Sequence, residues 1–249
     1  MKDYNHFVVL AAGDNPRELM ERYDLNKKVE PYVKYKFSDA GNLRRNYLSI
    51  VRGMLSSGNA SKEETDELKE TIEDIENMDD IQFFLDFTSE YDYDDETGDA
   101  ITDRNPEGKW TSCTVGKIFS VPFITISGKE TFSDIKGNID WNMMHLHGTE
   151  IYDATWDVVM GGKLPETDVE KQVYENMRNR TAYFEKFGTK EKYVASNTAF
   201  WCYAYVDKNG WVEIGDDEDQ FEWMTKFYDR FVVPLPENTL LTLFECRRN

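Results

Sequence analysis

Acidic side chains are concentrated in one segment of this chain. Residues 62–103 hold eighteen Asp and Glu against two Lys, a net charge of −16 (2 − 18), whereas the whole chain carries −19. The remaining residues are therefore close to neutral. Closely spaced carboxylates repel one another and favour water or a basic partner. We therefore expect the segment to be an architectural feature with an interaction surface.

The rest of the composition indicates a folded protein. The 249 residues are 40% apolar and 14% aromatic, whereas a disordered acidic chain would be poor in Trp, Tyr and Phe. The cysteines, Cys113, Cys202 and Cys246, are odd in number and widely spaced, so we expect free thiols in a reducing compartment. No basic region followed by an apolar run opens the sequence, and no apolar stretch approaches the roughly 20 residues of a spanning helix. These features predict a cytoplasmic protein.

The two ends of the chain have strand-like patterns. His6–Ala12 is β-branched and apolar, and it ends at a turn where Asn15 and Pro16 predict the start of a helix reaching about Tyr23. Residues 239–246 are a mostly apolar run after the Pro-rich turn at 234–238. We expect both termini to share one sheet.

A helical hairpin is expected after residue 42. Residues 42–55 predict a helix with Leu43, Tyr47, Ile50 and Met54 on one face. Ser61 with Glu64 forms a capping box that starts a second helix. In that helix the apolar Leu68, Ile72 and Ile75 lie on one side at 100° per residue. The opposite side carries six carboxylates, those of Glu63, Asp66, Glu67, Glu70, Glu73 and Asp74.

The later part of the chain mixes helices with short strands. Residues 110–126 predict two strands, and residues 148–160 and 166–187 predict two helices. Residues 198–206 and 211–214 predict a β-hairpin, and Asp219 is expected to cap a helix through Phe231. The predicted class is α+β, as one domain over residues 1–249. Its mixed or antiparallel sheet is formed by both termini and the central hairpins, with the helical hairpin and acidic loop inserted at residues 42–103.

Two segments partly match metal-binding patterns, and neither match is complete enough to predict a site. Residues 92–103 place oxygens at positions one, three, five and twelve of an EF-hand loop, but Gly98 is at position seven instead of six and Asp103 is shorter than the usual Glu. His145 and His147 would share one side of a strand, but a third ligand has no motif. We expect no metal, no cofactor and no catalytic group among these residues.

A cluster of aromatic residues invites a different interpretation. Phe200, Trp201, Tyr203 and Tyr205, near Trp211, would resemble a platform on which nucleic-acid bases stack. A chain of charge −19 without a basic stripe repels phosphates, so packing in a core or interface is favoured.

One motif resembles a known family. Asn105-Pro106-Glu107-Gly108-Lys109-Trp110, with the preceding residues 95–100, resembles a family of uncharacterised tailed-phage proteins. The hallmark of that family is Asn-Pro-x-x-Lys-Trp followed by Asp-Trp-Tyr-x-Ile-Gly-Gly-Arg-Trp. The similarity extends to residues 7–16, to residues 200–206 with Gly210 and Trp211, and to residues 235–243. It implies a phage origin and the cytoplasm of the host cell as the location.

The chain departs from that hallmark after Trp110. Residues 111–119 lack the aromatic pair and the Arg-Trp, and only Gly116 is retained. The family has no settled activity, so the resemblance implies origin and no chemistry. If the aromatic and Arg cluster is a site in the family, that site is altered in this chain.

The expected function is binding to a protein. We predict an accessory protein that inhibits a basic host protein, a nucleic-acid-binding defence or replication enzyme, by occupying its nucleic-acid surface. The expected state is a monomer or small homo-oligomer, with neither a membrane nor nucleic acid as direct partner. In this prediction the six helix acids replace phosphates, a second patch is acidic, and apolar anchors lie between them. The second patch is Asp92, Asp94, Asp95 and Glu96, and the anchors are Phe83, Phe84 and Tyr91.

Three alternatives stay open at this point. The acidic face would also serve as a solvated surface that keeps the protein soluble. An enzyme acting on a nucleotide or other small molecule would have its pocket near residues 110–119. A virion or assembly component would satisfy its apolar surface by self-association.

Overall fold

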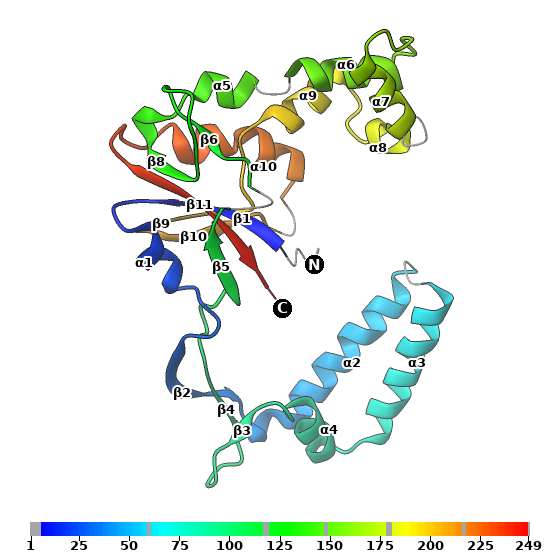
Figure 1. The fold of residues 1–249 in the computed structure, drawn as a ribbon. Coiled ribbons are helices and arrows are strands. Elements are labelled where there is room, and N and C mark those ends of the chain that lie inside the picture. The colour runs from blue at the N-terminus through cyan, green and yellow to red at the C-terminus, as the bar shows by residue number, and fades with distance from the viewer. Residues whose placement is uncertain are drawn as a thin grey trace. The chain divides into compact units, whose positions relative to one another are not determined.

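The computed structural model describes residues 6–58, 61–116, 120–146, 149–177, 181–215 and 218–248. The chain divides into two compact units (Figure 1). Unit 1 is Met1–Leu25 with Glu107–Asn249, and unit 2 is Asn26–Pro106. Both units contain helices and strands, which confirms the α+β class. The predicted insertion at residues 42–103 falls inside unit 2, and the single domain stays a prediction.

Unit 1 contains a mixed sheet built from both ends of the chain. Its strands, in order, are β10 (Gly210–Glu213), β9 (Ala204–Asp207), β1 (His6–Ala12), β11 (Leu240–Arg247) and β5 (Ser112–Val115), and β8 (Ser133–Ile135) also pairs with β11. β1 is antiparallel to β11, with Leu10 opposite Leu243, and parallel to β9. The prediction that both termini share one sheet is confirmed.

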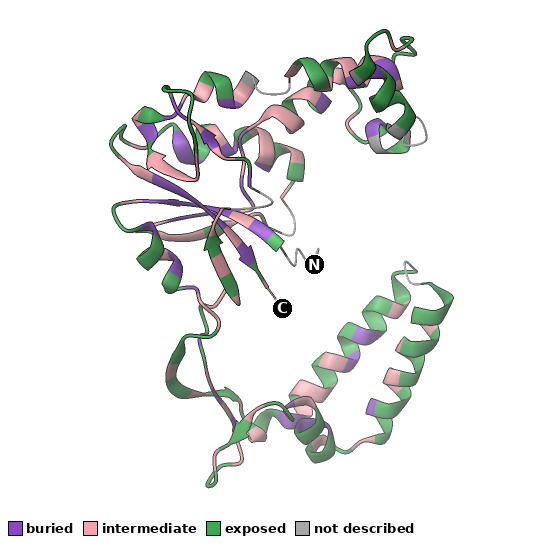
Figure 2. Cartoon of the chain, in the orientation of Figure 1, coloured by how far each residue is buried: buried purple, intermediate pink, exposed green. Residues whose placement is uncertain are grey.

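Side chains alternate along β1 and fill a hydrophobic cluster on each face of the sheet. Leu10 and Ala12 belong to one cluster, together with Trp223 and Phe227 of helix α10 (Gln220–Phe227). Val9 and Ala11 belong to the other, together with Met20 of helix α1 (Pro16–Glu21). Figure 2 shows the buried residues gathered along β1 and β11. The sheet is therefore covered on both faces.

The remaining elements of unit 1 are short. A two-stranded sheet is formed by β6 (Phe123–Ile124) and β7 (Glu130–Thr131). The helices are η2 (Lys136–Asn138), α5 (Trp141–Leu146), α6 (Thr149–Val159), α7 (Asp168–Met177), α8 (Thr181–Glu185), α9 (Lys190–Thr198) and the π-helix η3 (Tyr228–Val232), which continues α10. Among the described residues no helix is long and apolar enough to cross a membrane.

Two predictions for this region need correction. Residues 198–206 were expected to form a strand, but the strand starts at Ala204, because α9 extends to Thr198 from its cap at Thr189. Residues 166–187 were expected to form one helix, but the structure assigns α7 and α8 separately, and residues 178–180 lie outside the described residues. The β9–β10 hairpin and the Asp219 cap of α10 are confirmed.

Unit 2 combines a small sheet with three helices. β4 (Ala100–Arg104) lies between β2 (Lys28–Tyr35) and β3 (Asp92–Tyr93). After the short helix η1 (Phe37–Asp39) come α2 (Ala40–Ser56), α3 (Lys62–Asn77) and α4 (Asp80–Phe87). α2 packs against both α3 and α4 (Figure 1). The predicted helical hairpin is confirmed, including the Ser61–Glu64 capping box.

The apolar face predicted for α2 is only half covered. Leu43 and Tyr47 pack in clusters that contain Phe84 and Phe83 of α4, and the Tyr47 and Phe83 rings lie 5.8 Å apart. Ile50 and Met54, further along the same face, are each 55% exposed. The first two residues of the predicted face are therefore covered, and the last two are exposed. Eight-residue α4 is much shorter than seventeen-residue α2.

Candidate functional site

The six predicted acids lie on the exposed side of α3. Glu63, Asp66, Glu67, Glu70, Glu73 and Asp74 are all exposed, whereas Ile75 on the opposite side is buried. Figure 2 shows α3 as exposed along most of its length. The helix starts at the cap where Ser61 Oγ accepts from Glu64 N (3.2 Å) and Glu64 Oε2 accepts from Ser61 N (2.7 Å). The cap fixes where the helix begins and so which side carries the acids.

Few cations are placed near these acids. Within the part of the chain that the structure describes, Asp66 is the one of the six with an ion pair, to Lys69 at 3.6 Å. The arginines of α2 have other partners, since Arg44 pairs with Asp80 (2.7 Å) and Arg52 pairs with Glu76. The acidic side of α3 therefore keeps its charge for water or a partner.

The second predicted patch forms a β-hairpin between β3 and β4. Asp94 Oδ1 accepts from the backbone of Thr97 (2.8 Å) and of Glu96 (3.0 Å) and from Thr97 Oγ1 (3.0 Å). These bonds hold the pKa of Asp94 below its usual range. Asp92, Asp95 and Glu96 are exposed. Asp94 thus stabilises the turn, and the other three form the exposed part of the patch.

No metal site is found in the described residues, where no group of three His, Cys, Asp or Glu could hold an ion. Residues 92–103 pair as β3 and β4 instead of wrapping around a centre. His145 is in helix α5, which corrects the strand considered for it, and His147 lies outside the described residues. The His145 ring lies 4.5 Å from that of Tyr228, and burial lowers the pKa of this imidazole.

Two of the predicted anchors are core residues. Phe83 and Phe84 are 4% and 0% exposed, so they cannot reach a partner, and this corrects the role predicted for them. Successive helical residues point about 100° apart, so each ring enters a different cluster of unit 2. Tyr91 is half-buried, and its ring lies 5.7 Å from that of Tyr35. The exposed apolar side chains of α4 are those of Ile81 and Leu85.

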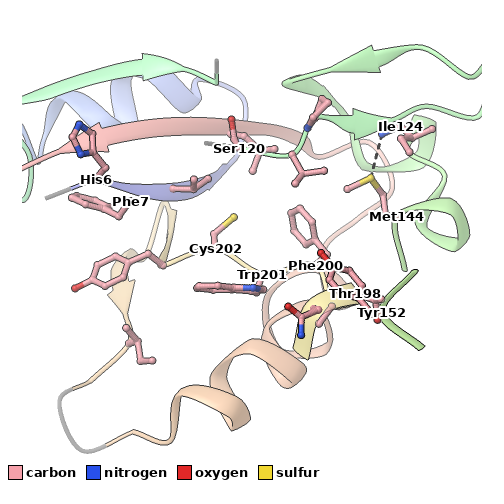
Figure 3. A pocket seen from close by; sticks show the side chains of 18 of the residues that line it. His6, Phe7, Ser120, Ile124, Met144, Tyr152, Thr198, Phe200, Trp201 and Cys202 are labelled. Atoms are coloured by element: carbon pink, nitrogen blue, oxygen red, sulfur yellow. Dashed lines mark hydrogen bonds between the residues drawn. The ribbon is translucent and has the colours of Figure 1, made fainter. Parts of the chain in front are cut away.

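Unit 1 contains a cavity of about 620 Å³. Its floor includes Val8 and Leu243 of neighbouring strands, and its walls come from several other elements, among them α5, α6 and the segment after α9. Figure 3 shows His6 and Phe7 at one end, Phe200, Thr198 and Tyr152 at the other, and Trp201 between them. The lining is mostly apolar, as small-molecule sites generally are.

One wall of the cavity is held by a carboxylate. Glu245 Oε1 on β11 accepts from Ser120 N (2.9 Å) and from Ser120 Oγ (2.8 Å). These bonds fix the start of the segment that carries Val121 and Pro122 to the rim. The Ser120 hydroxyl donates in this contact and so tethers the segment to β11.

The hallmark residues have structural roles. Trp110 is buried, and its backbone oxygen accepts from Leu25 N (2.8 Å). Lys109 Nζ pairs with Glu213 (3.0 Å). A Cβ at Gly116 would lie 2.3 Å from the Phe132 ring, and one at Gly108 would lie 2.8 Å from Leu25 Cα, so neither position has room for a side chain.

The cavity lies next to residues 110–119, near which an enzyme pocket is predicted, and residues 117–119 of that segment lie outside the described residues. It is lined by Ser120, Val121 and Pro122, and residues 110–116 take no part in the lining. Phe200, Trp201 and Tyr203 line the cavity, whereas Tyr205 and Trp211 pack elsewhere in the clusters of the sheet. The sequence favours packing of this aromatic run in a core or an interface, and in the structure Phe200 is buried while Trp201 is half-buried.

Comparison of the chain with models of known protein families, with curated proteins and with solved structures finds no match.

Proposed function

We propose that this protein binds a basic protein partner through unit 2 and blocks a surface that otherwise binds nucleic acid. The observation that carries the proposal is the exposed row of six carboxylates on α3, of which Asp66 is the one with an ion pair in the described structure. With the resemblance to phage proteins, the partner is a host protein. The action is inhibition by occupancy.

The spacing of the carboxylates supports this proposal. Glu63 and Asp74 are eleven residues apart, or roughly 17 Å at 1.5 Å per residue, so the six charges average about 3 Å apart along the axis. One DNA strand carries a charge about every 3.4 Å. A groove lined with Lys and Arg for a phosphate backbone would attract a helix face of this density.

The charges of the hairpin are also segregated. Arg44 and Arg52 of α2 pair with Asp80 and Glu76, on the side of α3 away from the six acids or beyond its end. A helix face used only for solubility has no need of this separation. The second patch at Asp92, Asp95 and Glu96 adds exposed negative charge to the same unit.

The test is binding to proteins captured from host lysate with a tagged wild-type chain. The test variant neutralises the six acids as E63Q, D66N, E67Q, E70Q, E73Q and D74N. A control variant removes the same number of charges from exposed acids of unit 1, as D14N, E21Q, E150Q, E175Q, E185Q and E191Q.

We expect the α3 variant to associate at least tenfold more slowly with the captured protein, because electrostatic steering sets the association rate. The control variant should stay within twofold of wild type. Added salt and a short DNA duplex should both release the partner. A partner that binds the α3 variant as well as wild type, or that duplex DNA fails to displace, would refute the proposal.

A further inference from the structure

The cavity of unit 1 has the size of a small-molecule site. Its volume of about 620 Å³ lies inside the range of roughly 300–1,000 Å³ typical of ligand pockets. It is built within unit 1, from β1, β11 and the walls described above. Any ligand here is therefore independent of the acidic surface of unit 2.

Charge restricts the ligand. The described residues that line the cavity include no Lys or Arg, and their one carboxylate is that of Glu130. Phosphate and carboxylate groups need cationic or multiple N–H donors to replace their water. A nucleotide is therefore disfavoured, and an uncharged molecule is favoured.

Aromatic side chains in the lining narrow the class of ligand further. Phe200 is buried and Trp201 is half-buried, and both line the cavity; Figure 3 shows Phe200 near Tyr152 and Trp201 toward the middle. Met144 contributes a thioether to the lining, and its sulfur accepts from Ile124 N (3.3 Å). Aromatic faces and polarisable sulfur favour contact with flat ring systems.

Two polar atoms at the same end are available for hydrogen bonds. Asn197 Nδ2 donates to Tyr193 O (2.7 Å), which leaves Asn197 Oδ1 as an acceptor. No partner for the Tyr152 hydroxyl is found in the described part of the chain. A half-buried amide and phenol of this kind give orientation to a ligand that carries a donor and an acceptor.

We propose that this cavity binds a small, uncharged, planar heteroaromatic molecule. Its ring packs against Phe200 and Trp201, and its polar edge bonds to the Tyr152 hydroxyl and to Asn197 Oδ1. The class includes free heterocyclic bases without sugar phosphate. The protein thus has a second binding function that does not rest on the one proposed for α3.

The experiment uses 2-aminopurine as a fluorescent probe, because stacking on an aromatic side chain quenches it. We expect saturable quenching by the full-length protein, reversed by adenine. AMP, which adds a phosphate to the same ring, should compete at least tenfold more weakly. Cyclohexanecarboxamide, uncharged but not planar, should not compete.

Matched variants assign the binding to the cavity. Trp201→Leu should weaken probe binding at least tenfold, whereas Trp211→Leu, on the other face of the sheet, should stay within twofold of wild type. Tyr152→Phe keeps the ring and should weaken binding about threefold to tenfold, as loss of one hydrogen bond predicts. Its control is Tyr174→Phe on the exposed side of α7.

Three results would overturn the inference. The first is the absence of saturable probe binding to the wild-type protein, and the second is equal competition by adenine and AMP. The third is unchanged probe binding in both single variants, Tyr152→Phe and Trp201→Leu. If Trp201→Leu does not fold, Tyr152→Phe decides alone, because removing one hydroxyl oxygen leaves the ring contact with Tyr193 in place.

Discussion

The two units carry nearly equal charge on very different amounts of protein. Unit 2 holds 81 of the 249 residues and a net charge of −10 (10 − 20), and the longer unit 1 carries −9 (19 − 28). Unit 1 buries large clusters on both faces of its sheet, whereas the clusters of unit 2 contain three buried residues each. A small core leaves more of a chain at its surface. Unit 1 thus contains a cavity between its packed elements, whereas unit 2 leaves its acidic side chains exposed.

The prediction with the largest expected effect asks whether the cores of the two units unfold independently. Phe84 is fully buried in unit 2, and Phe227 is 1% exposed in unit 1. Replacing a buried Phe by Ala costs about 3–5 kcal/mol. We expect Phe84→Ala to expose residues 26–106 to hydrogen exchange while unit 1 stays protected. Mass spectrometry of peptides from each unit measures this difference.

Phe227→Ala is the matched variant for the other unit. It removes the same ring from the cluster beneath α10, and it should raise exchange in unit 1 peptides. If Phe84→Ala instead raised exchange equally across the whole chain, the two units would unfold together and the contrast between them would fail.

The second prediction concerns a buried cation in unit 1. Lys136 is 6% exposed, and its Nζ donates to Leu235 O (2.7 Å) and Val233 O (3.2 Å) and pairs with Glu237 (2.9 Å). Lys136→Met removes these donors, so the backbone carbonyls of Val233 and Leu235 each lose one hydrogen bond. We expect a loss of about 1–3 kcal/mol in urea unfolding.

Lys129→Met serves as its control, because Lys129 is exposed in the same unit. Its effect should stay within about 0.5 kcal/mol, as for most surface substitutions. Equal stability of the two variants would mean that the Lys136 contacts have no net value. The buried charge of unit 1 would then contribute as little to the free energy of unfolding as an exposed surface charge does.

Local sequence signals predicted the parts of the fold that depend on neighbouring residues. The Ser61–Glu64 capping box predicted the start of α3, and the β-branched, apolar run His6–Ala12 predicted the strand β1. With the start of α3 fixed, the 100° rotation per residue also placed its six acids on the exposed side. The hairpin of β9 and β10 was predicted from Asn209-Gly210, and the structure starts β10 at Gly210, so its two-residue turn is Lys208-Asn209.

Features set by distant packing were not predictable in this way. Ile50 and Met54 match the apolar period of α2, yet their exposure depends on where α4 ends. Phe83 and Phe84 stand in an acidic segment, and they are buried by packing of α4 against several other elements of unit 2. The cavity takes its residues from both ends and the middle of the chain, so no single stretch carries its signal.

The third prediction compares the same capping motif in the two units. Thr167 and Glu170 cap α7 as Ser61 and Glu64 cap α3. Glu170 accepts from Thr167 N and Glu166 N and pairs with Lys163 (2.9 Å), and these contacts lower its pKa to about 2. Hydrogen bonds with Ser61 also lower the pKa of Glu64. Both groups are therefore expected to titrate below their ordinary value of 4.5.

Carboxyl NMR resonances followed against pH measure both values. Because the folded pKa is depressed, each cap contributes stability that is present in full above the unfolded pKa and is lost as the pH falls through the folded one. For Glu170 that window runs from about 4.5 down to about 2. Lys163→Met should raise the pKa of Glu170 and leave that of Glu64 unchanged. A Glu170 value near 4.5 in wild type would contradict the contacts described.

The smallest effect is expected for the loss of single ion pairs. It compares a well-exposed pair in unit 2 with a less exposed pair in unit 1. Arg52 and Glu76 join α2 to α3 in unit 2 with side chains 57% and 49% exposed, whereas Lys109 and Glu213 in unit 1 are 33% and 26% exposed. Exposed pairs contribute about 0.2–1 kcal/mol, and salt screens them.

Double-mutant cycles with Arg52→Gln and Glu76→Gln should give a coupling near the lower end of that range, and it should vanish at about 1 M salt. The corresponding cycle for Lys109 and Glu213 should give the larger and less salt-sensitive coupling, because less water reaches that pair. A stronger coupling at Arg52 and Glu76 would mean that charge contributes more to the stability of unit 2 than its exposure implies, and the acidic side of α3 would then have to be weighed as part of that stability.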